Sequence, residues 1–304
     1  GSRGPTRWGK GEERGMSWEY EALFDRDGMT EPTELEKAAI EEGRWKEHPS
    51  NIPVGKMGYR TCTTKAGPRL EIEVYPLFGR EQKAEAKKEK RNLTPEKIQK
   101  HNEERARRRL VQLMDANFGE KDLHVTLTYR EAPGWEQAKK DIRNYLGRIR
   151  RMRRRMGLEE LKYIYAMEDE EDGVRKRIHV HLIMNGGISR ETVEEIWEKG
   201  YANCDRLQPG KEGLEAIARY ISKQNRGKSR RKWSSSQNLK KPQVRKSDTK
   251  LSNRRVKRLA RGFEAESKDI MEKVWPGYEF VRSQVRVSDV VDGVYIRVLM
   301  RKRA

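Results

Sequence analysis

Two histidines separated by one residue are the strongest chemical signal in the chain. His179 and His181 lie in the segment Ile178–Leu182, where apolar residues alternate with the histidines as in a β-strand. Because alternate residues of a strand point to the same face, both imidazoles should leave the sheet together, which is the geometry of a chelating pair. Two hydrogen-bonded histidines beside a polar turn would show the same pattern, so the pair alone leaves metal binding open.

A carboxylate near this strand could complete a metal site. Glu168 follows the apolar segment 163–167, and we predict a polar turn over 168–173 that folds this segment against the histidine strand. Two imidazoles and one carboxylate with open positions suit Mg²⁺ or Mn²⁺ holding an anionic substrate. Glu168 fits an ordinary acidic turn equally well, and His124 on the strand 123–129 is an alternative ligand.

A tyrosine and a lysine one helical turn apart form a second group. Tyr220 and Lys223 lie in a predicted helix over 212–224, at the edge of its apolar side. A phenol with a pKa of about 10 is a poor nucleophile unless its anion is stabilised, and an ammonium at i+3 can do this. The same spacing also describes a tyrosine at the edge of the core beside a surface lysine.

The elements that must position these groups follow from periodicity. We predict strands over 123–129, 163–167, 177–184 and 201–207, with helices over 135–156, from Ser189 to Gly200 and over 212–224. This β-α-β-β-α-β order predicts an α+β fold with a ferredoxin-like (RRM-like) central antiparallel sheet, helices on one face, and the other face free for a ligand.

Three regions are expected along the chain. Residues 1–55 form an accessory or poorly ordered extension with a short helix from Thr33, residues 56–265 form the main domain, and residues 266–304 form a C-terminal hairpin that packs on the same domain. A further hairpin is predicted over 59–75, and a helix that starts at Thr94 and Pro95 is predicted to run to about Asp115.

The charge distribution favours a polyanionic partner. The chain has 68 Lys and Arg against 48 Asp and Glu, a net charge of +20. Residues 223–262 hold 16 basic residues and one acid, and residues 139–155 hold nine basic residues and one acid. Apolar residues interrupt the first of these stretches, which argues against a disordered tail: Trp233, Leu239, Val244, Leu251, Val256 and Leu259.

Composition excludes several classes of protein. No apolar stretch approaches the ~20 residues of a membrane helix, and no signal peptide opens the chain. The two cysteines lie far apart and have no neighbour at zinc-ligand spacing, so we expect reduced thiols in a cytoplasm.

Three segments in order resemble the motifs of HUH endonucleases: residues 123–129 (LHVTLTY), 179–181 (HVH) and 220–223 (YISK). The set resembles single-tyrosine rolling-circle replication initiators of plasmids and phages. Asn117-Phe118, residues 233–236 and residues 240–242 are similar to the bacterial and phage branch of that family.

The resemblance implies an activity and its residues. His179, His181 and Glu168 would hold a divalent ion, and Tyr220, assisted by Lys223, would cleave single-stranded origin DNA and form a 5′-phosphotyrosine. The DNA-binding residues expected on this basis come from the tyrosine helix and the basic stretch: Arg219, Arg226, Lys228, Arg230, Arg231, Lys232, Trp233, Lys240 and Lys241.

Departures from the family pattern define the expected partners. Gln224 stands where a second tyrosine would lie, so a second copy of the chain in a homodimer is expected to complete the reaction. Ser222 occupies the first glycine position of a Walker A motif, so a host helicase and polymerase in a bacterial cytoplasm are expected to serve this mobile-element protein. A transposase, a relaxase or a non-catalytic module that binds single-stranded nucleic acid remain the alternatives.

Overall fold

The computed structural model describes residues 45–46, 58–77, 94–171, 174–223, 233–288 and 293–303. The helix predicted from Thr33 and the basic residues Arg226, Lys228, Arg230, Arg231 and Lys232 lie outside these residues.

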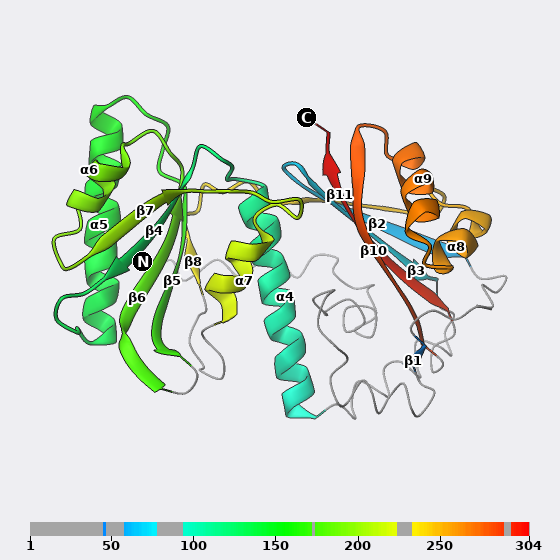
Figure 1. The fold of residues 1–304 in the computed structure, drawn as a ribbon, viewed down its shortest axis with the longest axis horizontal. Coiled ribbons are helices and arrows are strands. Elements are labelled where there is room, and N and C mark those ends of the chain that lie inside the picture. The colour runs from blue at the N-terminus through cyan, green and yellow to red at the C-terminus, as the bar shows by residue number, and fades with distance from the viewer. Residues whose placement is uncertain are drawn as a thin grey trace, which may run out of the picture.

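Two antiparallel sheets with helices between them and on their outer sides form the described part of the chain (Figure 1). The first sheet has the strand order β1-β10-β11-β3-β2-β9 and the second has the order β7-β4-β6-β5-β8. The strands of the first sheet are β1 (Trp45–Lys46), β2 (Tyr59–Ala66), β3 (Arg69–Pro76), β9 (Gln243–Ser247), β10 (Tyr278–Ser288) and β11 (Val294–Lys302). Those of the second are β4 (Leu123–Thr128), β5 (Tyr163–Glu171), β6 (Val174–Met184), β7 (Ala202–Arg206) and β8 (Ser234–Ser235). The described helices are α4 (Pro95–Asp115), α5 (Trp135–Arg155), α6 (Arg190–Glu195), α7 (Glu215–Lys223), α8 (Asn253–Ala260) and α9 (Glu264–Val274).

The second sheet confirms the predicted α+β class. Its first four strands, in the order β7-β4-β6-β5, arise from the chain order β4-α5-β5-β6-α6-β7 that the sequence predicts. Helices α5 and α6 cover one face, where the Tyr145 hydroxyl donates to the carbonyl of Val193 at 2.8 Å. Leu123, Val125 and Leu127 alternate toward this face and are fully buried.

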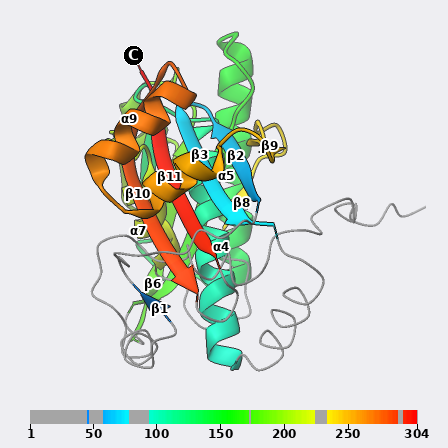
Figure 2. The same ribbon diagram turned by 90° about the vertical axis from the view of Figure 1, so that its right-hand side faces the viewer.

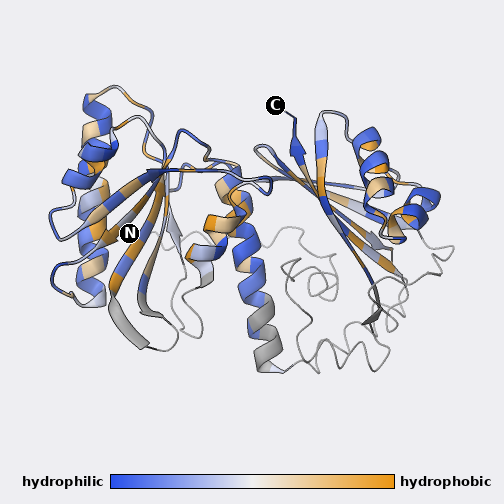
Figure 3. Ribbon diagram, viewed as in Figure 1, coloured by the Kyte–Doolittle hydropathy of each residue, from blue (hydrophilic) through white to orange (hydrophobic). Residues whose placement is uncertain are grey.

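The opposite face of this sheet, which the sequence pattern predicts to be free, is partly covered by α4 and α7. Ile164, Ala166 and Ile183 point to this side and form one buried cluster with apolar residues of the two helices. Figure 3 shows the hydrophobic residues of α4 gathered in the turns beside α7. Apolar residues on both faces of a sheet require cover on both faces, and this is why only part of the second face stays open.

The polar turn predicted over 168–173 is shorter than expected. Strand β5 continues to Glu171, and β6 begins at Val174, so Glu168 lies within the ladder and pairs with His179. Backbone hydrogen bonding to β6 carries the strand past the end of its apolar segment, because the ladder depends on main-chain groups more than on side-chain type.

The C-terminal hairpin β10–β11 belongs to the first sheet, where β11 pairs with β3. Helices α8 and α9 cover the outer face of this sheet, as Figure 2 shows. The basic stretch is divided between the two sheets, since β8 pairs with β5 while β9 pairs with β2. Segments on both sides of the predicted boundary at residue 265 therefore build one sheet and its helical cover.

Buried ion pairs connect the inner face of the first sheet to α4 and α7. Arg69, only 5% exposed, donates to Glu71 at 2.5 Å, to Glu215 at 2.9 Å and to Asp115 at 3.4 Å. Arg108 of α4 donates to Glu71 at 2.9 Å and pairs with Glu73. This network fixes α7 relative to the first sheet, while the apolar cluster fixes it to the second.

Membrane insertion has no support in the helices. No helix among the described residues is both long and apolar enough to cross a bilayer.

Candidate active site

The two histidines of the motif lie side by side on the face of the second sheet that α7 approaches. Thr126 of β4 pairs with His181, and Glu168 of β5 pairs with His179. Directly paired residues of antiparallel strands point to the same face, so both histidines and Glu168 share one side of the sheet. His181 is 3% exposed, whereas His179 is partly exposed.

Glu168 and His181 stand close enough to share a ligand. The distance from His181 Nε2 to Glu168 Oε1 is 3.9 Å, which is too long for a hydrogen bond. Two donors that each lie about 2.1 Å from one ion can be up to about 4 Å apart, so this gap is compatible with a shared cation. Among the described residues, no three His, Cys, Asp or Glu side chains are already gathered as a metal-binding group. His179 would therefore have to turn toward the other two.

The surroundings of His181 keep its imidazole neutral. Burial, and then the neighbouring His124 and His179, lower the pKa of His181 to about 4. Its Nδ1 lies 3.4 Å from the hydroxyl of Thr126, on the side of the ring away from Glu168. A neutral imidazole is the form that binds a metal ion, so the donors fit a divalent cation by chemistry.

His124, the alternative ligand, lies on the other side of His181 from Glu168. Its ring is stacked on that of His181 with centroids 5.7 Å apart and an interplanar angle of 25°. The Nε2 atom of His124 is buried and has no hydrogen-bond partner in the described structure. Since β6 lies between β4 and β5, a single ion held by His181 and Glu168 is on the opposite side from this ring.

Tyr220 stands next to the histidine pair. Its ring meets the ring of His181 edge to face, with centroids 5.0 Å apart and an interplanar angle of 77°. Ala218 and Ile221 are buried on either side of it, while Tyr220 itself is 49% exposed. The helix thus buries its apolar side in the α4 cluster and leaves the phenol beside the imidazole and open to solvent.

The N-terminal end of α7 is held in place by α4. Asp115 at the end of α4 accepts a hydrogen bond from the backbone N–H of Leu214 at 2.8 Å. Gly213 has a φ of +71°, and a Cβ there would lie 2.5 Å from the Asp115 carboxylate oxygens. Only glycine fits this position, which brings the first turn of α7 against the end of α4.

The remaining predicted DNA-binding residues do not form one patch around Tyr220. Arg219 lies 3.6 Å from Glu215 of the buried ion network, and Trp233 is half-buried against the α4–α7 cluster. Lys240 and Lys241 are exposed. Lys223 ends α7, and its side chain is outside the description.

Sequence reasoning missed the residues that position these elements. The side chain of Asn117 accepts from the Lys240 N–H at 2.7 Å and donates to the Lys240 carbonyl at 2.9 Å, tying the basic stretch to α4. Arg69 and Asp115 act similarly on α7. A buried charge pattern in β3 (RLEIEV), with charged residues at alternate positions, was the available signal.

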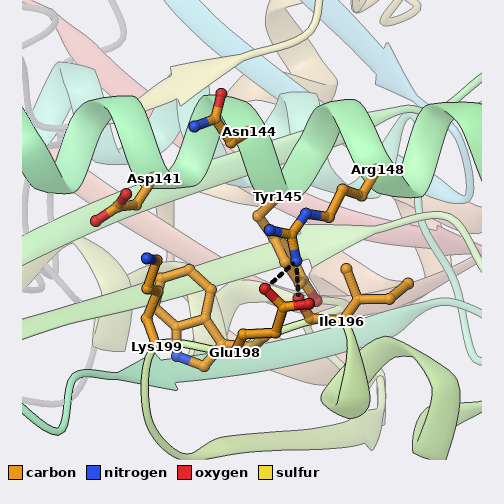
Figure 4. A pocket seen from close by; sticks show the side chains of 8 residues that line it. Asp141, Asn144, Tyr145, Arg148, Ile196, Glu198 and Lys199 are labelled. Atoms are coloured by element: carbon orange, nitrogen blue, oxygen red, sulfur yellow. Dashed lines mark hydrogen bonds and ion pairs between the residues drawn. The ribbon is translucent and has the colours of Figure 1, made fainter.

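A small pocket lies away from this site, between α5 and the segment 196–199 (Figure 4). Arg148 crosses it, donating to the carbonyl of Ile196 at 3.2 Å and pairing with Glu198 at 2.8 Å. None of the predicted site residues lines this pocket.

Comparison with known proteins gives a family match for part of the chain. Residues 122–225, about a third of the chain, match the family model described as replication-associated protein ORF2. Searches of curated proteins and of solved structures found no significant match. The matched range runs from just before β4 to just after α7 and includes the histidines, Glu168 and Tyr220. This region of the chain is therefore similar to a replication-associated protein family.

Proposed function

We propose that this protein is a replication initiator that nicks and rejoins single-stranded origin DNA through a covalent bond to Tyr220. The observation that carries the proposal is the contact between the Tyr220 and His181 rings, made by two segments that both fall inside the replication-associated match. A half-exposed phenol beside a buried neutral imidazole and a carboxylate is a suitable arrangement for phosphoryl transfer.

A divalent ion, Mg²⁺ or Mn²⁺, would be held by His181, Glu168 and His179. When bound, it would supply Lewis-acid polarisation of the scissile phosphate. The protein residues carry out the remaining tasks. Thr126 keeps the ring of His181 oriented, and the helix α7 holds the phenol at the edge of the imidazole.

The proposed reaction exchanges one phosphodiester for another. The Tyr220 oxygen bonds to phosphorus, and the bond from phosphorus to the 3′ oxygen breaks. The phenol loses its proton, and the leaving 3′ oxygen gains one, with Lys223 as the proposed source of stabilising charge. Because the phosphotyrosine is again an ester, attack by a 3′-hydroxyl reverses the step and reseals the strand.

The substrate class follows from the access to Tyr220. A base-paired strand cannot enter the space between a helix and a sheet face, so we expect a single strand or an extruded hairpin. The exposed Lys240 and Lys241 and the half-buried Trp233 are proposed to contact that strand, together with the basic residues that follow α7. We also propose that a second copy of the chain completes the joining step and that a host helicase unwinds the duplex.

The decisive experiment compares two tyrosine variants of the full chain. Each protein is incubated with a labelled single-stranded oligonucleotide and Mn²⁺, and the products are separated under denaturing conditions. We expect a covalent protein–DNA species with the wild type and with Tyr201→Phe, a control at a tyrosine that is 70% exposed. We expect none with Tyr220→Phe, which should still bind the oligonucleotide.

Other outcomes distinguish the alternatives. A wild-type protein that binds the strand and never forms the covalent species would be a non-catalytic binding module. Covalent product with a transposon end or a transfer origin, in place of a replication-origin hairpin, would identify a transposase or a relaxase.

A further inference from the structure

The outer face of α5 carries a stripe of cations on the side of the sheet opposite to the histidines. Lys140, Arg143, Arg151 and Arg154 are all exposed, and their spacing places them within about 80° of arc on one side of the helix. From Lys140 to Arg154 the stripe is about 21 Å long. Figure 1 shows α5 on one side of the second sheet and α7 on the other.

The stripe is not used by the fold. Other basic residues of α5 have structural partners: Lys139 pairs with Glu136, Arg148 with Glu198, and Arg153 is buried with bonds to three carbonyls. By contrast, the four stripe cations have no carboxylate partner within the described residues. Their mutual repulsion is a cost that the isolated protein does not recover, which indicates an anionic partner.

Gly147 lies at the centre of the stripe. Glycine inside a helix is destabilising, and it is usually kept where another group approaches closely. Yet a Cβ at Gly147 would meet only the end of the Arg151 side chain, at 3.8 Å, among the described atoms. No packing contact within the described fold requires a glycine here, so the bare backbone is available to a partner outside the chain.

We infer that this stripe, centred on Gly147, binds the phosphate backbone of double-stranded DNA. A 21-Å length of duplex presents about 12 phosphates, enough to neutralise all four cations. The exposed positions of α5 carry no aromatic side chain, which a surface for single strands would use for stacking. The apolar side of α5 is buried in the core, so the helix cannot insert into a lipid surface.

The surface would hold a duplex while the opposite face acts on a single strand, a use that rests on the proposed function, although duplex binding itself does not. The test measures the affinity of the full chain for a blunt 25-bp duplex by fluorescence anisotropy between 50 and 200 mM salt. In the variant K140Q/R143Q/R151Q/R154Q we expect at least roughly tenfold weaker binding at 100 mM salt and a salt slope shallower by about 3 to 4.

A control variant removes the same charge elsewhere. K257Q/K268Q/K273Q/K302Q changes four exposed lysines of α8, α9 and β11 and should weaken duplex binding less than about threefold. Equal losses in both variants, or an unchanged affinity in the α5 variant, would overturn the proposal. A loss confined to vesicles containing phosphatidylserine would overturn it in favour of a membrane surface.

Gly147→Ala tests the close approach without harming the fold. The substitution should raise the thermal unfolding midpoint, because alanine favours the helix, and should weaken duplex binding several-fold. Unchanged duplex affinity in this variant would refute the central role of Gly147. Formation of the covalent species with a single strand should be the same in all these variants, so a failure of the nicking activity and a failure of duplex binding are read separately.

Discussion

Replacement of Arg69 by methionine tests whether the first sheet holds the tyrosine helix in place. Arg69 contacts the carboxylates of Glu71, Asp115 and Glu215 and the carbonyl of Glu212, and it is almost completely buried. Methionine has a similar volume and removes the charge, so the expected effect comes from the carboxylates that lose their partner.

The size of the effect follows from what each carboxylate retains. Breaking a buried ion pair by removing one partner costs about 3–5 kcal/mol. Glu71 keeps Arg108 and Arg297, and Glu215 keeps Arg282, whereas Asp115 keeps the Leu214 N–H. Because every carboxylate retains at least one partner, we expect about 3 kcal/mol, at the low end of this range.

The measurement is the free energy of unfolding in urea, followed by circular dichroism at pH 7. The matched control is Arg60→Met, which breaks the pair that Arg60 makes with Asp248 at 2.6 and 2.7 Å. That pair is exposed, so its loss should cost less than about 1 kcal/mol. Arg69→Met should also slow formation of the covalent species in the absence of denaturant, because Glu215 lies in the first turn of α7. Equal costs for Arg69→Met and Arg60→Met would refute the reasoning.

Three further predictions concern the elements around the site. Gly213→Ala should cost clearly more in unfolding free energy than Gly157→Ala, for which the positive φ alone predicts about 1–2 kcal/mol, because only the first places a Cβ against the Asp115 carboxylate; similar costs would contradict the close approach. Asn117→Ala should lose about 1 kcal/mol of stability and weaken single-strand binding measured by anisotropy, since it frees the segment at Lys240 from α4, and an unchanged affinity would separate that segment from the DNA site. Burial raises the pKa of Glu71, but Arg69, Arg108 and Arg297 outweigh burial and hold that pKa well below its usual range, so its stabilisation is complete above about pH 4.3 and is lost as the pH falls through the folded value. Urea unfolding between pH 6 and 3 should show this loss, and Glu71→Gln should flatten it; a wild-type stability that does not fall with acid would contradict the network.

The sequence alone determined the local elements of the second sheet and the side on which its histidines lie. A strand fixes the direction of alternate side chains, so the pattern over 178–182 was sufficient to put His179 and His181 on one face. The helices from Trp135 and around Tyr220 follow equally from their periodicity of apolar residues.

Tertiary structure decided which long-range partners meet. Strand pairing set the register that brings Glu168 opposite His179 and extends β5 through the predicted turn, and main-chain hydrogen bonds carry no strong sequence signal. The second sheet-forming unit, built from β2, β3 and the C-terminal hairpin, likewise depends on pairing between segments more than 200 residues apart. The position of Tyr220 beside His181 requires contacts from α4, Arg69 and Gly213 that spacing along the chain does not contain, because a helix pattern fixes which side is buried and not against what it is buried.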